Sequence, residues 1–305
     1  MTTPSAAHPP ASLAPDDIAR LQSWQGRSES MTDCLTAVPV AALSATLDRD
    51  DPVPIAQTEA NGGTELPPLW HWLYFLPRHR QSELGPDGHA RRGGFLPPVP
   101  LPRRMWAGGR LTWTPGNPLR VGQEATRTSS IQSVTHKSGR SGELVFVVVR
   151  HEIHNAWGLA LTEEHDIVYR PAPMPGEPAP APTLAETGAA WQREVVPDDV
   201  LLFRYSALTF NGHRIHYDRR YVTQTEGYPG LVVHGPLIAT LLVDLVRRHR
   251  PDARLLGFQF RAVRPTFDLH PLRLNGQPSD DGKTVRLWSQ DHEGLLTMQA
   301  TATLA

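Results

Sequence analysis

Residues 205–245 read YSALTFNGHRIHYDRRYVTQTEGYPGLVVHGPLIATLLVDL, and this stretch decides how the second half of the chain folds. It begins with a polar segment that carries Asn211, His213 and His216, continues through a glycine-rich turn at 227–235, and ends in an apolar run that predicts a buried helix. An imidazole beside a helix N-terminus suits acyl-thioester chemistry, because the imidazole moves protons and the first backbone N–H groups stabilise a developing oxyanion.

The buried helix, expected at 235–249, is preceded by a helical segment at 198–210 and followed by strand-like segments. The first half repeats this order, with helical patterns first and β-branched segments after them. Strands are expected at 110–114, 125–136, 143–155, 158–169, 255–263, 272–275, 284–290 and 295–304. In the first half, helices are expected at 16–24 and 36–47, whereas the aromatic run 69–76 fits a buried helix or a strand, with Pro67-Pro68 favouring a helix start.

Each half therefore consists of helix and then antiparallel meander, which indicates an internal duplication without an obvious sequence repeat. A long apolar helix followed by a twisted antiparallel sheet favours an α+β fold in which the sheet wraps around the helix. This is the hot-dog arrangement, and two tandem copies make a double hot-dog. We expect a disordered tail at 1–14, an N-terminal hot-dog at 15–170, a proline- and alanine-rich linker at 171–195 and a C-terminal hot-dog at 196–305.

The composition narrows the class of protein. The 305-residue chain has 30 Lys and Arg against 31 Asp and Glu, and no basic stripe alternates with aromatic residues, so nucleic acid is not an expected partner. No apolar run approaches the ~18 residues of a membrane-spanning helix, and the segment 1–15 lacks the features of a secretory signal. A single cysteine, Cys34, fits a reducing compartment. We expect a cytoplasmic protein without membrane contact.

Motifs for other chemistries are missing from the sequence. There is no G-x-S-x-G elbow, no G-x-G-x-x-G and no P-loop, which disfavours a hydrolase or a nucleotide-dependent enzyme. The pairs His213/His216 and His151/His154 have the spacing H-x-x-H, but no motif for a third zinc ligand accompanies them. No metal is therefore expected, and His151 and His154 would point to opposite faces of a strand.

The stretch 209–244 resembles the hydratase-2 motif of MaoC-like (R)-specific enoyl-CoA hydratases. In that motif a His follows an Asp by five residues, and a glycine-rich turn and an Ala/Val-His-Gly helix start come next. His216 occupies the His position and Val233-His234-Gly235 the helix start, but Asn211 stands where the family has Asp.

With Asn211 at this position, the segment is similar to one branch of the superfamily. TFNGHRIHYD in the second half, with LPPLWHWLYFLP and GPDGHARRGGFLPPVPLPRRMWAGGRL in the first, resembles the fungal mitochondrial 3-hydroxyacyl-thioester dehydratases and their bacterial relatives. The bacterial members include mesaconyl-C4-CoA (3-methylfumaryl-CoA) and itaconyl-CoA hydratases. The resemblance covers roughly residues 15–305.

The resemblance implies that the chain hydrates an α,β-unsaturated thioester and needs no cofactor besides the CoA of its substrate. His216 would activate water and return a proton to Cα, unless it is a loop histidine that caps a carbonyl. Asn211 would position the water, or it simply closes a turn. Gly235, with His234, would offer N–H groups to the thioester oxygen, with close helix–sheet packing as a second reading. Asp218 would either orient a catalytic group or bind a backbone N–H.

The loop 91–110 places five arginines among apolar residues: Arg91, Arg92, Arg103, Arg104 and Arg110. Arginine binds carboxylates and phosphates through its planar fork, although surface arginines are often only solvated. We expect Arg104 to face the substrate. Phe95, Met105 and Trp106 are expected to shape the acyl tunnel, with core packing as the alternative. The first half lacks an N-x-x-x-x-H pair in the corresponding place, so its hot-dog is expected to be degenerate and to shape the substrate and CoA site.

The leading hypothesis is a hydratase that acts on a short, branched, carboxylated enoyl-CoA, namely 3-methylfumaryl-CoA or itaconyl-CoA, and forms citramalyl-CoA. The alternatives are a (3R)-hydroxyacyl-thioester dehydratase of fatty-acid synthesis and a non-catalytic acyl-thioester binding protein. A thioesterase is a fourth possibility, because hot-dog folds host that reaction. The chain is expected to be a monomer or a homodimer.

Overall fold

The structure is a computed structural model that describes residues 13–58, 62–139, 142–172 and 181–305. Most of the predicted tail 1–14 and the central part of the predicted linker 171–195 lie outside the described residues. Within them, no helix is long and apolar enough to cross a membrane.

The first half combines short helices with long strands. A helix, a strand and a second helix open it: α1 (Pro15–Gln22), β1 (Ser28–Cys34) and α2 (Ala37–Thr46). Two short 3-10 helices, η1 (Trp70–Leu73) and η2 (Gln81–Glu83), interrupt the long connection that follows. Four strands then form a meander: β2 (Arg103–Trp113), β3 (Glu124–Gly139), β4 (Gly142–Asn155) and β5 (Gly158–Arg170).

The second half carries its helices before its meander. It begins with β6 (Trp191–Val195), α3 (Asp199–Leu208), η3 (Arg214–His216), α4 (Arg219–Gln224) and the long helix α5 (Gly235–His249). The strands β7 (Leu255–Ala262), β8 (Leu272–Pro278), β9 (Thr284–Gln290) and β10 (Leu296–Leu304) follow.

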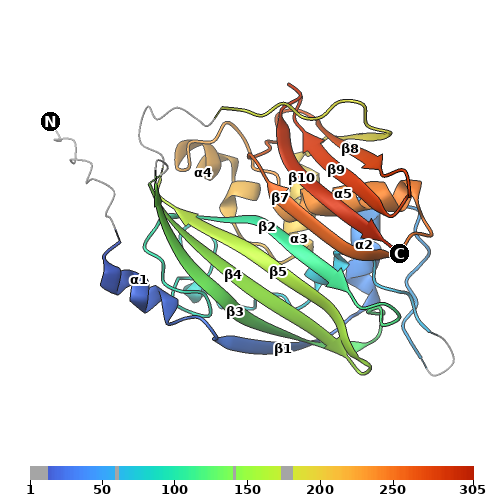
Figure 1. Cartoon of the computed structure of the whole chain (residues 1–305), viewed down its shortest axis with the longest axis horizontal. Helices are drawn as coiled ribbons and strands as arrows, with labels where there is room; N and C mark the ends of the chain where they lie inside the picture. Colours follow the sequence, from blue (N-terminus) through green and yellow to red (C-terminus); the bar gives the residue numbers. More distant parts are fainter. Residues whose placement is uncertain (1–12, 59–61, 140–141, 173–180) are drawn as a thin grey trace.

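All ten of these strands belong to one antiparallel sheet, in the order β1-β3-β4-β5-β2-β7-β10-β9-β8-β6 (Figure 1). The halves merge where β2 pairs with β7. Gly108 and Gly109 lie at this junction. A Cβ on Gly108 would stand 2.5 Å from the carbonyl oxygen of Phe260, and one on Gly109 would stand 2.8 Å from that of Glu164. Both distances are too short for a side chain. Gly108 therefore allows the close approach of β7 at the junction between the halves, and Gly109 allows that of β5 within the first half.

Helix α5 is the apolar centre of the second half. Every residue from Leu237 to Val246 is buried, and the helix packs against β6, β8, β9 and β10. One charge is buried with it: Asp244 accepts hydrogen bonds from Arg49 of the first half and from Arg193 and Arg248 of the second. Breaking a buried ion pair by removing one partner typically costs about 3–5 kcal/mol. Asp244 therefore fixes α5 to both halves.

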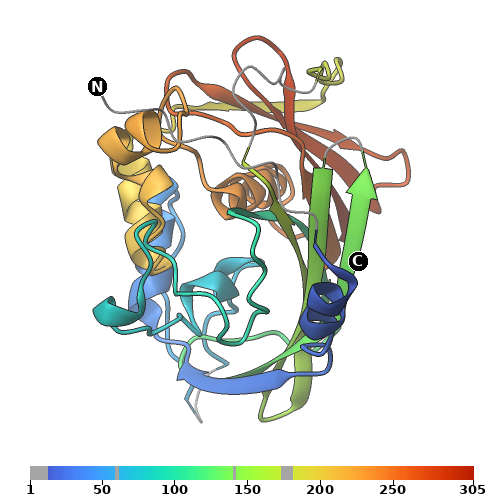
Figure 2. The ribbon, with the colours of Figure 1, turned by 90° about the vertical axis from the view of Figure 1, so that its left-hand side faces the viewer.

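Helices α2, α3 and α4 form a layer on the concave side of the sheet, whereas α1 packs against β3. Figure 2 shows α5 enclosed by the curved sheet, with α3, α4 and α2 beyond it. Helix α2 makes its main contacts with α3 and η1 rather than with a strand. The loop 77–102 crosses the same side before it enters β2. The concave side therefore holds the ends of several elements close to the start of α5.

Sequence and structure agree on most elements. The predicted helix 235–249 and the four strands after it are present, and 36–47 contains α2. His151 is buried and His154 is exposed, as expected for residues on opposite faces of a strand. The run 69–76 forms only the short η1. Strand β6, which pairs with β8, lies inside the predicted linker, so the linker prediction 171–195 was wrong at its C-terminal end.

The expectation of a central helix in each half holds only for the second. Helix α2 is shorter than α5 and is not enclosed by the first-half sheet as α5 is by the second (Figure 2). The inner face of the first-half sheet carries polar side chains instead. Glu163 is buried there between His71 and His165 and accepts hydrogen bonds from Trp72 and from the two imidazoles. The first half is therefore a hot-dog sheet with an altered interior.

Candidate active site

Four histidines meet at the N-terminus of α5. The ring centroids of His89 and His213 are 3.9 Å apart, those of His213 and His216 are 5.4 Å apart, and those of His216 and His234 are 3.7 Å apart. They come from the loop before β2, from η3 with the residue before it, and from the N-cap of α5. Residues far apart in the sequence thus form one continuous row of imidazoles.

His216 has the geometry of a general base. Its Nδ1 lies 2.7 Å from the carbonyl oxygen of Val232, so Nδ1 carries the proton and donates it. The lone pair is then on Nε2. Burial lowers the pKa of His216 to about 4, although the Val232 carbonyl opposes the shift, and His89 lowers the pKa further. The ring is therefore neutral near neutral pH, and its Nε2 can accept a proton. The reading of His216 as a carbonyl-capping histidine describes Nδ1 correctly and leaves Nε2 available.

The ring of His234 packs against one face of the His216 ring. Its ring is stacked on that of His216, and its Nε2 lies 2.8 Å from the hydroxyl oxygen of Ser206. Burial, followed by the effects of His216 and His213, holds the pKa of His234 well below its ordinary value. Its Nδ1 is buried and has no hydrogen-bond partner among the described residues. The side chain of His234 thus fixes the face of His216, and its backbone is the N-cap of α5.

The start of α5 leaves room for a ligand beside Gly235. Pro236 has no N–H, so the free donors of this first turn are those of Gly235 and Leu237. A Cβ on Gly235 would meet no heavy atom within 4 Å. Close helix–sheet packing therefore does not explain this glycine. The open space lies next to backbone donors and to the positive end of the helix dipole, which together favour an oxyanion.

Asn211 and Asp218 organise the polar segment around His216. The Oδ1 atom of Asn211 accepts a hydrogen bond from the N–H of His213 at 3.0 Å, which is the turn-closing interaction. The Nδ2 group keeps its donors for a ligand such as water. Asp218 accepts the N–H of Tyr221 at 2.9 Å as the N-cap of α4, and it pairs with Arg214. Asp218 therefore has the backbone-binding role, and the described contacts do not join it to a catalytic group.

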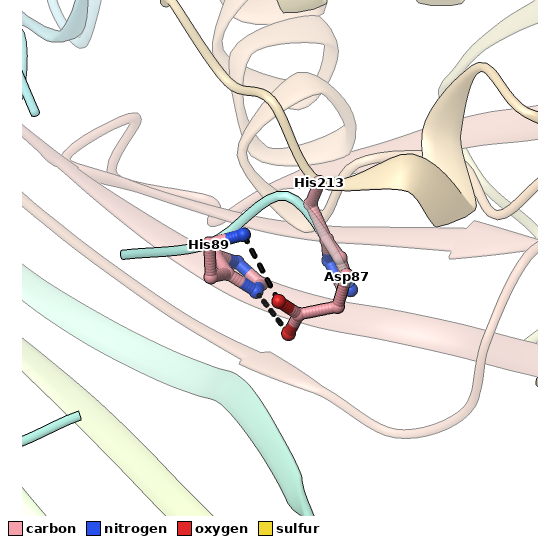
Figure 3. Close-up of side chains that lie close together, drawn as sticks. All are labelled: Asp87, His89 and His213. Carbon is pink, nitrogen blue, oxygen red and sulfur yellow. Dashed lines mark hydrogen bonds and ion pairs between the residues drawn. The ribbon is translucent and has the colours of Figure 1, made fainter. Parts of the chain in front are cut away.

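A loop of the first half completes the row of histidines. The N–H of Arg214 donates to the carbonyl oxygen of Asp87 at 2.9 Å. A Cβ on Gly88, whose φ is +88°, would stand 1.8 Å from the carbonyl oxygen of Gly212. The loop 85–90 thus lies directly on 211–214, and only glycine allows this approach. It carries His89 to His213 (Figure 3).

Asp87 holds His89 through its carboxylate. One carboxylate oxygen lies 3.1 Å from His89 Nδ1, and the other accepts the His89 backbone N–H at 3.1 Å (Figure 3). Burial raises the pKa of Asp87, but its hydrogen bonds and charge interaction with His89 outweigh burial and bring the pKa below its usual range. Sequence reasoning missed both residues, although the Asp-Gly-His order in a long loop was a usable signal.

Of the five arginines of the loop 91–110, Arg92 and Arg104 act by their charge on the histidine row, and Arg104 acts on two of its members. It lowers the pKa values of His89 and His213, after the larger effect of burial, and it hydrogen-bonds Tyr169. The other four have different partners. Arg91 and Arg92 bind carbonyl oxygens of their own loop, Arg103 binds Tyr228 and Glu226, and Arg110 pairs with Glu164 and Asp166.

The three apolar residues expected to line the tunnel lie in different places. Phe95 packs against the cluster around Val99 and Val145, which supports the core-packing alternative for it. Trp106 packs against Trp72, Phe260 and His165, close to the buried Glu163. Met105 is half-buried on β2 opposite Val168. These three residues therefore do not form one wall beside the histidine row.

Two further observations concern ligands. Asp87, His89 and His213 bring candidate metal-ligand atoms within 4.8 Å of one another, a grouping that the sequence did not indicate. His216 is not part of it, because its Nδ1 is bound to Val232. A hollow of about 770 Å³ lies over Gln259, Arg261 and Gln299, whose side chains are exposed. It contains none of the four histidines, so the site is defined by its chemistry rather than by that hollow.

Comparison with known proteins agrees with this geometry. The sequence model described as hydroxyacyl-thioester dehydratase type 2 matches residues 69–268. The chain is 50% identical over 287 residues to the mesaconyl-C(4)-CoA hydratase of Chloroflexus aurantiacus, covering 92% of this chain and 97% of that protein. It is 28% identical to the mitochondrial hydroxyacyl-thioester dehydratase type 2 of Schizosaccharomyces pombe, covering 80% and 88% of the two chains.

Solved structures show the same fold at low sequence identity. A MaoC-like dehydratase from Phytophthora capsici has a TM-score of 0.65 at 12% identity, covering 94% of this chain and 98% of that one. A Mycobacterium tuberculosis protein described as a double hot-dog has a TM-score of 0.54 at 15% identity, covering 92% and 96%. The predicted α+β double hot-dog is therefore confirmed.

A double hot-dog with a buried histidine at a helix N-terminus is the arrangement of the MaoC-like hydro-lyases. Within this class, the chain belongs to the hydroxyacyl-thioester dehydratase type 2 family, because the match to that family's sequence model covers about two thirds of it. It is an enzyme of the hydratase/dehydratase kind. The non-catalytic alternative has no support from these comparisons.

Proposed function

We propose that this enzyme adds water to the double bond of 3-methylfumaryl-CoA (mesaconyl-C4-CoA) and forms citramalyl-CoA. The observation that carries the proposal is His216, a buried neutral imidazole with a free Nε2 beside the open N-terminus of α5. The relative from Chloroflexus aurantiacus supports the choice of substrate, since it shares half of its residues with this chain over nearly the whole length.

The chemistry needs one group that takes a proton and later returns it. His216 Nε2 removes a proton from water while the oxygen bonds to Cβ, and the electron pair of the double bond moves into an enolate. The N–H groups of Gly235 and Leu237 stabilise the enolate oxygen, and a donor of this kind contributes about 2.7–4 kcal/mol. The imidazolium then returns the proton to Cα, which restores neutral His216. Atoms and charge balance without a further co-reactant.

Asn211 has a positioning role in this scheme. Its amide has no proton to exchange in the working pH range, so both proton transfers belong to His216. Its Oδ1 already holds the His213 N–H, and its Nδ2 group is a donor that can orient the oxygen of the attacking water.

Dehydration of (3R)-hydroxyacyl-thioesters is the second candidate. The fungal relatives at 28% and 25% identity carry the name of that activity. The same His216 chemistry would run in reverse. The charge of Arg104, which acts on His89 and His213, favours a substrate with a carboxylate, because a guanidinium binds an oxyanion better than an alkyl chain.

A parallel hydration assay separates these substrates. Purified protein is mixed with 3-methylfumaryl-, itaconyl- and crotonyl-CoA, and loss of the ultraviolet absorbance of the conjugated thioester is followed. We expect the fastest turnover with 3-methylfumaryl-CoA and a loss of about 10²–10⁴-fold in His216→Ala. His154→Ala, which changes an exposed histidine of β4, is the matched control. Equal or faster turnover of crotonyl-CoA would favour the dehydratase, and release of free thiol would reveal a thioesterase.

A cytoplasmic location and a monomeric or homodimeric state remain predictions. Size-exclusion chromatography with light scattering measures the oligomeric state directly. No nucleic acid is expected to bind, since the charges of the chain are balanced.

A further inference from the structure

The row of imidazoles runs from the interior to the surface. His234 and His216 at its inner end are 0% and 8% exposed, whereas the side chains of His89 and Asp87 at its outer end are 28% and 40% exposed. The proposed thioester lies at the inner end, at the start of α5. The phosphates of coenzyme A must stay in contact with water or with cations. We therefore expect the rest of the substrate to extend towards the outer end of the row.

A small hairpin, residues 83–91, forms this outer end. The N–H of Gly85 donates to the carbonyl oxygen of His89 at 2.7 Å, and the N–H of Arg91 donates to that of Glu83 at 2.9 Å. The turn of the hairpin lies on the polar segment of the second half. Its two ends therefore lie farther from the catalytic groups than its turn does.

Positive charge gathers around the ends of this hairpin. The segment 77–92 has four arginines against two acidic residues, which leaves two positive charges in excess when histidine is neutral. The whole chain has a net charge of −1, so the excess is local. The charged residues of the segment are Arg78, Arg80, Arg91, Arg92, Glu83 and Asp87.

Three of these arginines, Arg78, Arg80 and Arg91, are exposed and form no ion pair with another described residue. Glu83 joins two of them, because its carboxylate accepts the backbone N–H of Arg80 at 2.7 Å and its carbonyl oxygen accepts that of Arg91. Arg91 contacts its own loop only through Nε, whereas both terminal nitrogens of Arg92 are held by carbonyl oxygens. The guanidinium groups of the first three are therefore available to an anion.

Phe210 is a second unusual feature close to this hairpin. Helix α3 ends in a Schellman motif, in which the N–H of Asn211 donates to Ser206 and the N–H of Phe210 donates to Ala207. The left-handed position of this motif is usually a glycine, but here it is Phe210, with φ +50°. The ring is 58% exposed, so packing in the protein does not offset the strain. An exposed, strained aromatic residue beside Asn211 indicates a contact with a ligand.

We propose that these residues form the subsite for coenzyme A: Arg78, Arg80 and Arg91 bind its phosphates, and Phe210 contacts its pantetheine arm. The inference rests on the proposed function, from which it takes the CoA thioester, and it adds the residues that hold the carrier. Arginine binds phosphate oxygens through its planar fork. The aromatic ring removes methylene and methyl groups of the arm from water.

The length of the arm agrees with the position of the arginines. Ring separations of 5.4 and 3.9 Å lead from His216 through His213 to His89. Arg91 follows two residues later, at about 3.3 Å for each extended residue. A pantetheine arm is about as long as four to five extended residues, or about 15 Å. A thioester beside His216 therefore has an arm long enough to bring its phosphates to the ends of the hairpin.

Three thioesters of 3-methylfumarate that differ only in the carrier test the proposal. The carriers are coenzyme A, pantetheine, which lacks the nucleotide and its phosphates, and N-acetylcysteamine, which keeps only the part of the arm next to sulfur. The measurement is kcat/KM for hydration of each thioester. We expect wild type to prefer each larger carrier. The preference for coenzyme A over pantetheine should decrease as the salt concentration rises, because salt screens the phosphate contacts.

Substitutions assign the two preferences to residues. Arg80→Ala and Arg91→Ala should each lower the preference for coenzyme A over pantetheine by about threefold to tenfold, through KM. Phe210→Gly should lower the preference for pantetheine over N-acetylcysteamine by about threefold to tenfold. Its denaturation midpoint should be no lower than that of wild type, because glycine relieves the left-handed strain. Arg250→Ala, beyond the far end of α5, and Trp157→Ala, in the β4–β5 turn, change equally exposed residues and should keep the wild-type preferences.

Wild-type preferences in both arginine variants, or a preference for coenzyme A that does not respond to salt, would overturn the phosphate assignment. An unchanged preference for pantetheine in Phe210→Gly would overturn the assignment of the arm. Faster hydration of an acyl-carrier-protein thioester, slowed by the same arginine substitutions, would assign the surface to an acidic carrier protein instead.

The proposed function fails separately, if wild type hydrates none of the three thioesters. Titration calorimetry with free coenzyme A tests the subsite in that case as well. Its affinity should fall about threefold to tenfold in each arginine variant and stay at the wild-type value in Arg250→Ala. Hydration with wild-type preferences in every variant would remove only the present inference.

Discussion

The rings of His216 and His234 are stacked, with 3.7 Å between their centroids and 18° between their planes. Each ring has one nitrogen bound to a neighbour, His216 to the carbonyl of Val232 and His234 to Ser206. A proton added to either ring would place a charge against a second imidazole in a buried place. Burial of the stack therefore keeps His216, the proposed base, neutral, and this state has consequences that can be measured.

The first prediction concerns the pH dependence of kcat/KM. His216 must be neutral to accept a proton, and burial lowers its pKa to about 4. We expect kcat/KM for 3-methylfumaryl-CoA to be level through neutral pH and to fall only as the pH approaches 4. Short assays after a pH jump, followed by re-assay at neutral pH, separate this effect from unfolding. An acid limb near the ordinary imidazole value of about 6.5 would contradict it.

The second prediction concerns Asn211→Asp. The new carboxylate would keep the hydrogen bond to the His213 N–H and add a negative charge next to the histidine row. We expect the pKa values of His213 and His216 to rise, so the acid limb of kcat/KM should move upward by about one unit or more. Asn211→Ala loses the hydrogen bond without adding charge and should leave the position of the limb unchanged. Identical profiles in the two variants would show that position 211 does not influence the base.

The third prediction concerns the space at the start of α5. Gly235→Ala should fold with wild-type stability, because the added methyl group meets no atom within 4 Å. It should lower kcat/KM by about 10–10³-fold, because the methyl group fills the space assigned to the thioester. Gly257→Ala is the control, since its Cβ makes only ordinary contacts of 3.6 Å or more on β7. Full activity in Gly235→Ala would place the thioester elsewhere.

The fourth prediction compares two glycines with similar positive φ angles. Gly88 has φ +88° and Gly93 φ +92°, so alanine is strained at both, by about 1–3 kcal/mol. A Cβ on Gly88 also collides with the Gly212 carbonyl, whereas a Cβ on Gly93 has its nearest atom at 3.7 Å. We expect both variants to lose stability in chemical denaturation, but only Gly88→Ala to lose activity strongly, because the loop moves His89 away. Equal activities would show that the contact between the two segments is dispensable.

The fifth prediction links the buried histidines to stability. Burial lowers the pKa values of His89, His151, His213, His216 and His234 from the ordinary 6.5. Above pH 6.5 neither state binds protons at these groups, so their contribution is constant. As the pH falls from 6.5 towards 4, the unfolded chain binds protons that the folded chain does not. The free energy of unfolding then decreases by up to about 1.4 kcal/mol per pH unit for each histidine.

Denaturant unfolding at a series of pH values measures this slope. A His216→Gln variant should show a slope smaller by the share of one histidine between pH 6.5 and 4. A free energy of unfolding that stays constant over this range would contradict the buried neutral state of the row.

The elements that the sequence predicts well are those with a strong apolar pattern. Helix α5 begins and ends where the pattern placed it, because Gly235-Pro236 opens a run that must be buried on all sides. The two strands that the sequence did not predict, β1 and β6, form the two edges of the sheet. Their sequences, SESMTDC and WQREV, are mostly polar, because none of their side chains is fully buried in the core. Periodicity therefore carries little information about them.

The residues of the candidate site also differ in how well the sequence predicts them. His216, Asn211 and Gly235 lie within or close to the glycine-rich turn in sequence, and their resemblance to a motif predicts them as site residues from the sequence alone. Asp87 and His89 lie over a hundred residues earlier and reach the site only through the approach of Gly88 to Gly212. A close contact between two backbones leaves no periodic pattern in a sequence. The contact between the two segments could therefore not be predicted, although the Asp-Gly-His order was a usable signal for Asp87 and His89, and Arg104 of the first half was expected to face the substrate.

The junction between β2 and β7, beside Gly108 and Gly109, has a consequence for each half when it is made alone. If the two halves were made as separate chains, β2 and β7 would each become a bare strand edge with unpaired N–H and C=O groups. Such an edge is a template for pairing with any other chain, and proteins usually shield it. Within one polypeptide, each half covers the edge of the other at a high effective concentration. The fusion therefore protects the newly made chain from aggregation, independently of what it contributes to the reaction.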